Sequence, residues 1–269
     1  MITGLHHIAI VVRDLDAAVQ GYERLLDVAP MARDGGGARR AWFWLDNIGL
    51  EVIAPDGDGL SGDRVRARLD AAGEGQWLIA FTASDLDADT RLLERRGLAI
   101  SELTERAAMF DPASTGGVQL ALMGFPRLAS QTKGPLVGLD HVVVNTANPD
   151  RALAVYGAKL GLDLRLDREN PQWGARQMFF RAGHDLVEIG ASLKAPVSDG
   201  PDSFGGLAWL AADPAAVHAR LAASGFNLSE LRKGRKPGTQ VFTVRDAPNG
   251  ATLAGVPTIV IQQTAPEPA

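Results

Sequence analysis

Two histidines and two glutamates occupy matching places in the two halves of the chain, and their side chains could bind a metal ion. His7 lies in the run GLHHIAI, which reappears as GLDHVVV around His141. Glu51 and Glu188 occupy later apolar runs, GLEVIAP and LVEIG. A carboxylate buried in such a run needs a partner. Imidazole and carboxylate together suit Zn, Fe, Mn, Ni or Co, so we expect a divalent metal ion as cofactor.

Each of these residues taken alone also has an ordinary structural explanation. A histidine on a strand is often a hydrogen-bonded core residue, and a glutamate on a strand often faces solvent. The pairing of both types in both halves favours metal binding. Common descent of the two halves explains part of this pattern, so a chain without a bound metal stays an alternative.

The elements that must position these residues follow one pattern, strand-helix-strand-strand-strand, which occurs four times. In the first module the elements are expected at 8–12, 14–26, 31–33, 41–45 and 50–53. In the second module they are expected at 77–81, 85–97, 100–103, 107–110 and 118–123. Residues 54–62, rich in Asp and Gly, are expected to form a surface loop.

The repeat predicts an α+β fold in which four βαβββ modules form curved mixed β-sheets in two pairs. The first domain spans 1–125, with modules 1–72 and 73–125, and the second spans 136–260, with modules 136–197 and 198–260. Residues 126–135, which mix Pro, Gly, Ser and Lys, are expected to link the domains, and 261–269 to form a loose tail.

The chain resembles the vicinal oxygen chelate superfamily, which includes glyoxalases, epimerases, extradiol dioxygenases and bleomycin resistance proteins. The resemblance rests on the opening LHHIAIVVRDLDAAVQGYERLL, on the carboxylate in GLEVIAP, and on the βαβββ modules. It covers nearly the whole chain and implies a glyoxalase-like fold in tandem form. Because such a fold carries many chemistries, the resemblance alone does not name the reaction.

The resemblance also implies which residues bind the metal, since members place ligands on the first and last strands of a module. The implied ligands are His7, Glu51, His141 and Glu188, with Gln119 at the matching place in the second module. Pairing of neighbouring modules, favoured by short connections, leaves the ligand sets incomplete. Pairing of the first and third modules would instead give a site of two histidines and two glutamates.

These ligands favour a glyoxalase- or epimerase-like lyase or isomerase that acts on a small oxygenated metabolite with vicinal oxygens. Glu51 or Glu188 would serve as the catalytic base beside the metal. Leu78, Gly206 and Thr252 stand where the second and fourth modules would carry ligands. The loss of the second histidine makes extradiol dioxygenase chemistry less favoured.

Cationic and aromatic residues are candidates for substrate binding. Arg39 and Arg176 lie at matching strand starts and could bind an acid group through two hydrogen bonds. An apolar ligand could lie against four tryptophans, which are Trp42, Trp44, Trp173 and Trp209. This second possibility gives the alternative function, a metal-free protein that binds or sequesters a small molecule, as in the drug-resistance branch.

The overall composition favours small-molecule partners over nucleic acids and membranes. A net charge of −5 gives no general attraction to nucleic acid or to acidic membranes. The chain has no cysteine, and its first residues show no signal peptide. We therefore expect a cytoplasmic protein with a small-molecule substrate, no nucleic-acid or membrane partner, and a homodimer as one option for its oligomeric state.

Overall fold

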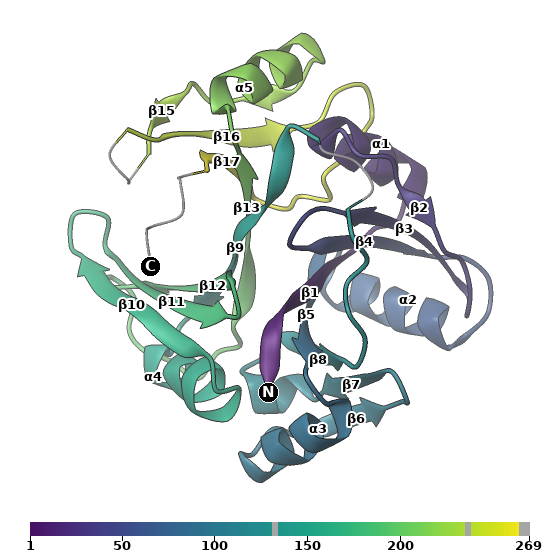
Figure 1. Cartoon of the computed structure of the whole chain (residues 1–269), viewed down its shortest axis with the longest axis vertical. Coiled ribbons are helices and arrows are strands. Elements are labelled where there is room, and N and C mark those ends of the chain that lie inside the picture. Colours follow the sequence, from purple (N-terminus) through teal and green to yellow (C-terminus); the bar gives the residue numbers. More distant parts are fainter. Residues whose placement is uncertain (131–133, 235–237, 264–269) are drawn as a thin grey trace. The chain divides into compact units, whose positions relative to one another are not determined.

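The computed structural model describes residues 1–130, 134–234 and 238–263 of the chain. In this part of the chain the strands form two mixed sheets, one of eight strands and one of nine, with a few helices (Figure 1). The eight-stranded sheet is built from the first two modules and the nine-stranded sheet from the last two. The predicted α+β fold of βαβββ modules is thereby confirmed.

Contacts within the chain define two compact units. Unit 1 comprises Met1–Ile8, Trp77–Arg127 and His141–Gly205. Unit 2 comprises Ala9–Gln76, Leu128–Asp140 and Gly206–Ala269. Part of the predicted linker (131–133) and most of the predicted tail (264–269) lie outside the described residues.

Unit 2 contains most of the first module and most of the fourth. The elements of its first module are α1 (Leu15–Leu26), β2 (Met31–Ala32), β3 (Ala38–Trp44), β4 (Gly49–Pro55) and α2 (Leu60–Ala72). Those of its fourth module are the end of β13 (Ser203–Ala211), α5 (Pro214–Ala223), β14 (Asn227–Leu228), β15 (Arg232–Lys233), β16 (Gln240–Asp246) and β17 (Thr258–Gln262). Strand β3 pairs antiparallel with β2 and β4, and β17 pairs parallel with β13 and antiparallel with β16.

Helix α1 begins and ends where its local sequence predicts. The Asp14 carboxylate accepts a hydrogen bond from the Ala17 amide at 2.9 Å and caps the first turn. Asp27, in the left-handed conformation with φ of 57°, ends the helix. The face that carries Leu15, Tyr22 and other apolar residues is buried.

The prediction that residues 54–62 form a surface loop was wrong at both ends of this segment. Strand β4 continues to Pro55, and α2 begins at Leu60, inside the predicted loop. The helix buries only Gly62, Val65 and Leu69, so its sequence shows little of the apolar periodicity that marks a helix.

Thr252 does not lie on the last strand of the fourth module, where its place in the repeat predicted it. It lies in the loop before β17, where its amide donates to the Ala17 carbonyl of α1 at 3.1 Å. In the same loop, the Leu253 carbonyl accepts a hydrogen bond from the Tyr22 hydroxyl at 3.1 Å. A Cβ atom on Gly21 would lie 2.2 Å from the Thr252 carbonyl oxygen, so this close approach requires glycine.

Unit 1 contains the second and third modules and the start of β1 (Ile2–Val11). The elements of its second module are β5 (Gly75–Ala83), α3 (Leu86–Arg95), β6 (Ile100–Leu103), β7 (Ala107–Phe110), the short helix η1 (Pro112–Thr115) and β8 (Gln119–Met123). Those of its third module are β9 (Leu136–Thr146), α4 (Pro149–Ala152), η2 (Leu153–Lys159), β10 (Asp163–Asn170), β11 (Ala175–Ala182) and β12 (Asp185–Ser192). The third module has the strand order β10-β11-β12-β9, in which β12 and β9 are parallel.

The helix of the third module differs from its counterpart α1. One α-helical turn, α4, is followed by the wider π-helical segment η2. Tyr156 in η2 is fully buried, as Tyr22 is in α1. Both tyrosines therefore belong to the core, as their positions on the helices predict.

Candidate functional site

The central strands of the third module bring His141 and Glu188 together in unit 1. His141 lies opposite Leu186 in the parallel pair of β9 and β12, so Glu188, two residues further, shares its face of the sheet. The His141 Nε2 and Glu188 Oε2 atoms are 3.0 Å apart. Both residues are buried, with 8% of their surface exposed. One predicted histidine–glutamate pair is therefore formed within a single module.

Two residues on neighbouring strands extend this pair across the sheet. Gln177 on β11 donates from Nε2 to the other carboxylate oxygen, Oε1 of Glu188. Arg168 on β10 in turn donates to Oε1 of Gln177 at 3.4 Å. Since a guanidinium has only donors, this contact turns the amide NH₂ of Gln177 toward Glu188. The rings of Phe179 and His141 pack nearly perpendicular to each other, with centroids 5.6 Å apart.

His7 is in unit 1 as well, and its neighbour there is His6. The two Nδ1 atoms are 2.8 Å apart, and both rings are buried. Burial lowers the pKa of His7 well below its usual value, and burial together with the charge of Arg127 lowers the pKa of His6 to about 4. Both imidazoles are therefore neutral at pH 7, which is the form that binds metals.

Gln119, the candidate ligand of the second module, is directed to the main chain. Its Nε2 donates to the Phe110 carbonyl at 2.7 Å. Strand β8 places Gln119 opposite Leu78 of β5, a buried apolar residue. The second module thus has an amide and a leucine where the third has the Glu188–His141 pair.

Glu51, in unit 2, forms an ion pair with an arginine on the neighbouring strand. Arg40 Nε on β3 lies 3.1 Å from Glu51 Oε1, and both side chains are mostly buried. Arg40 also donates from Nη1 to the Gly35 carbonyl at 2.9 Å. Burial raises the pKa of Glu51 to about 7, although the charge of Arg40 acts in the opposite direction.

Two of the four predicted aromatic residues stack beside this ion pair. The Trp42 and Trp44 rings are nearly parallel, with centroids 5.2 Å apart. Gly49 allows this arrangement, because a Cβ atom there would lie 2.6 Å from the Trp44 ring. In contrast, Trp209 is buried in the core of unit 2, and Trp173 in unit 1 is 52% exposed. Of the four predicted tryptophans, Trp42 and Trp44 therefore form a stacked pair, while Trp209 is a core residue and Trp173 is exposed.

The two arginines predicted to bind substrate both form ion pairs with aspartates. Arg39 Nη2 lies 2.9 Å from Asp16 in unit 2. Arg176 donates to both oxygens of Asp167 in unit 1, at 2.8 and 2.7 Å. Sequence reasoning passed over the next residue in each strand, Arg40 and Gln177, which contact the glutamates. Both residues directly follow the repeated GAR, so the repeat marks their position although not their role.

The ligand chemistry of the site is suited to a divalent cation, but the number of ligands is small. Across the residues that the structure describes, no three His, Cys, Asp or Glu side chains gather closely enough to hold one metal ion. The predicted ligands are also divided between units, since Glu51 belongs to unit 2 and the others to unit 1. Within unit 1, His141 and Glu188 are the imidazole and carboxylate in direct contact.

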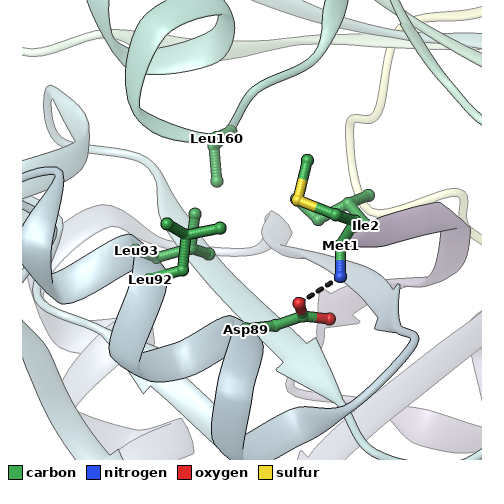
Figure 2. Close-up of a pocket in the computed structure, with 6 residues that line it drawn as sticks. All are labelled: Met1, Ile2, Asp89, Leu92, Leu93 and Leu160. Carbon is green, nitrogen blue, oxygen red and sulfur yellow. Dashed lines mark hydrogen bonds and ion pairs between the residues drawn. The ribbon is translucent and has the colours of Figure 1, made fainter.

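A small pocket in unit 1 lies apart from all of these residues. Figure 2 shows the amino group of Met1 pointing toward the Asp89 carboxylate, with which it forms an ion pair. The lining residues are Met1, Ile2, Asp89, Leu92, Leu93 and Leu160. None of them is a predicted site residue.

Sequence comparison assigns both halves of the chain to one superfamily. Models of the glyoxalase/bleomycin resistance protein/dioxygenase superfamily match residues 6–110 and 138–254. The chain belongs to this superfamily. The resemblance to vicinal oxygen chelate proteins in tandem form is thereby confirmed. Among proteins with curated functions, none gives a significant match.

Solved structures of the glyoxalase/bleomycin resistance protein/dioxygenase superfamily have the same fold at low sequence identity. A mutant of 4-hydroxymandelate synthase from Streptomyces coelicolor is 14% identical and aligns over 100% of this chain and 94% of its own, with a TM-score of 0.78. A Mn(II)-bound glyoxalase from Novosphingobium aromaticivorans is 16% identical over 97% and 82% of the chains, with a TM-score of 0.69. A halotolerant catechol dioxygenase is 12% identical over 98% and 87%, with a TM-score of 0.65.

These superfamily relatives include several kinds of enzyme, so similarity to them describes the fold and leaves the reaction open.

The helices of the described residues are too short or too polar to cross a membrane.

Proposed function

We propose that the chain is a metal-dependent lyase or isomerase of the glyoxalase or epimerase type, with its site at His141 and Glu188 of unit 1. Its substrate would be a small oxygenated metabolite with two adjacent oxygens. The observation that carries this proposal is the buried contact of 3.0 Å between His141 Nε2 and Glu188 Oε2. A carboxylate and an imidazole so close together, and facing the same side of a sheet, are suited to share a cation or a proton.

His141 and Glu188 fit a divalent cation as two of its ligands. A nitrogen and an oxygen donor suit Zn, Fe, Mn, Ni or Co. Catalytic metal sites commonly have three protein ligands, and the described residues offer no such group. We therefore expect weak binding of the cation by the protein alone, and stronger binding when a ligand contributes two adjacent oxygens.

Glu188 is the better candidate for the catalytic base. A bound divalent cation would act as a Lewis acid and acidify a C–H bond beside the substrate oxygens. The Glu188 carboxylate would accept that proton, while Gln177 holds its Oε1 atom in place. Glu51, the other predicted base, is ion-paired with Arg40. Arg39 and Arg176 are ion-paired with Asp16 and Asp167, which would compete with an acid group of the substrate for them.

A second candidate function is metal-free binding of a small apolar molecule. It is favoured by the small number of ligands in the described residues and by the stacked pair of Trp42 and Trp44 in unit 2. Such a protein would keep its ligand affinity when His141 is removed. The two candidates therefore make opposite predictions for one variant.

Titration with Mn²⁺, followed by electron paramagnetic resonance, tests the proposed function. Mn²⁺ is added to the metal-stripped full chain, alone and with acetohydroxamate, a probe with two adjacent oxygens. We expect binding that strengthens with the probe and that weakens about tenfold or more in His141→Ala and Glu188→Gln. His184→Ala, which removes an exposed histidine, is the matched control. Absence of binding to the wild type, or equal binding by all variants, would overturn the proposal.

A further inference from the structure

The sheet of the third module carries His141 and Glu188 on the less buried of its two faces. Its strands lie in the order β10, β11, β12 and β9 (Figure 1). On β9, Asn145 shares the face of His141 and is exposed. Val142 and Val144, which point to the other face, are fully buried. The face of His141 and Glu188 is therefore the one that a ligand can reach.

One row of residues crosses this face beside Glu188. Arg168 of β10 lies opposite Gln177 of β11, and Gln177 lies opposite Gly190 of β12. Gly190 in turn lies opposite Asn145 of β9. Because residues in register point to the same side of a sheet, Arg168 and Asn145 share the face of Glu188. Gly190, in the middle of the row, allows a ligand to approach the backbone of β12 closely.

Asn145 lies at one end of this row, between two glycines. A Cβ atom at Gly190 would lie 3.3 Å from Asn145 Oδ1, and a Cβ atom at Gly205 of β13 would lie 3.0 Å from Asn145 Nδ2. Larger residues at these two positions would crowd the amide. Because both neighbours are glycine, the exposed amide of Asn145 can form hydrogen bonds with a ligand.

Arg168, at the other end of the row, differs from the other arginines of the β10–β11 hairpin. Each of the other three forms an ion pair with an aspartate of β10; they are Arg165, Arg176 and Arg181. Within the described part of the chain Arg168 forms no ion pair, and its contact with Oε1 of Gln177 is long, at 3.4 Å. Arg176, next to Gln177 on β11, points to the opposite face from Glu188. The arginine placed to meet an acid group beside Glu188 is therefore Arg168.

We propose that the ligand of the His141–Glu188 site carries a carboxylate that Arg168 binds, with the Asn145 amide as a further contact across Gly190. This inference rests on the proposed function, and it narrows the substrate to molecules with an acid group besides their two adjacent oxygens. A guanidinium can donate two parallel hydrogen bonds to one carboxylate. Because it has five N–H donors, Arg168 can keep its contact with Gln177 while other donors bind the acid group.

Two 2-oxo acids of equal chain length test this inference. 2-Oxoglutarate and 2-oxopentanoate have the same two adjacent oxygens, but 2-oxoglutarate has a second carboxylate. With Mn²⁺ added to the full chain, isothermal titration calorimetry is expected to show about tenfold tighter binding of 2-oxoglutarate. Arg168→Met should abolish this preference and leave the affinity for 2-oxopentanoate unchanged. Asn145→Asp should reduce the preference, because its charge repels the second carboxylate.

Two controls exclude an indirect effect of Arg168. Arg165→Met removes another exposed arginine of β10 and should keep the full preference for 2-oxoglutarate. Acetohydroxamate, which has no acid group, should strengthen Mn²⁺ binding as much in Arg168→Met as in the wild type. A loss of that effect would overturn the inference, because Arg168 would then act through Gln177. Circular dichroism verifies that each variant is folded.

Measurements in EDTA separate this inference from the proposed function. Without metal both acids should bind more weakly, while the preference for 2-oxoglutarate that depends on Arg168 remains. If the wild type binds no Mn²⁺ but shows this preference, the proposed function is overturned and the inference stands. If Mn²⁺ binding depends on His141 and Glu188 but Arg168→Met binds both acids as the wild type does, the inference is overturned and the proposed function stands.

Discussion

Glu188 in unit 1 and Glu51 in unit 2 show how one repeated carboxylate acquires two different environments. Glu188 contacts the amide of Gln177 and the imidazole of His141. Glu51 contacts the cation Arg40. The backbone register around the two glutamates is the same, while the residue beside each carboxylate differs between the modules. A repeated motif therefore does not imply a repeated site.

The largest expected effect is that of removing the charge beside Glu51. Arg40→Met leaves a buried carboxylate without its cation and is expected to lower the free energy of unfolding by about 3–4 kcal/mol at pH 8. At pH 5 the cost should be smaller, because Glu51 can then be protonated. Urea unfolding at both pH values measures this difference. An equal loss at the two pH values would show that Arg40 stabilises the unit by packing rather than by charge.

The pH dependence of stability provides the second test of the same carboxylate. Burial raises the pKa of Glu51 from 4.5 to about 7. The folded state therefore holds this proton more tightly than the unfolded state, and its contribution to stability is complete below pH 4.5 and lost as the pH rises through 7. The loss amounts to about 3 kcal/mol. Glu51→Gln should flatten the dependence in urea unfolding between pH 4.5 and 7.5, and a wild-type slope retained in this variant would refute the assignment.

The paired tyrosines of the two helices are expected to differ by a smaller amount. Tyr22→Phe removes the hydrogen bond to the Leu253 carbonyl and should cost about 1 kcal/mol. The Tyr156 hydroxyl is buried and has no hydrogen-bond partner among the described residues. Tyr156→Phe should therefore be neutral or slightly stabilising. Thermal unfolding of the two variants measures this difference in stability. An equal loss of stability in both would mean that the Tyr156 hydroxyl also has a hydrogen-bond partner.

The smallest expected effect concerns the two arginines at the strand starts. Arg176 donates two hydrogen bonds to Asp167, while Arg39 pairs with Asp16 through a single one on the surface. Arg176→Ala should lower the melting temperature slightly, and Arg39→Ala should leave it unchanged. Added salt should reduce the difference between them. A larger loss for Arg39→Ala would contradict this order.

Local sequence signals predicted much of the fold. The helix expected at 14–26 is α1, and the strands expected at 100–103 and 107–110 have the predicted bounds. Capping residues and apolar periodicity act within a few residues, so they can be recognised in one sequence. Helix α2 was missed, since it is weakly amphipathic. The repeat predicted a helix in the third module, but not that its second part, η2, is π-helical.

The candidate site was predictable only in part. The types and places of His141 and Glu188 singled them out, and the structure brings them into contact. The roles of Gln177 and Arg40 could not be recognised by type, because a glutamine and an arginine on a strand are common surface residues. Their importance comes from the neighbouring strand in the sheet, which carries the glutamate that each of them contacts.

The sequence alone determined the four modules and their superfamily, and it singled out four residues as predicted metal ligands. Those features depend on residue type and on short spacings, which the chain carries whether or not it is folded. Tertiary structure decided which group each glutamate meets. That choice depends on strand register, which brings together residues eleven positions apart, such as Gln177 and Glu188. A cross-strand contact depends on pairing between distant segments, so it exists only once the sheet has formed.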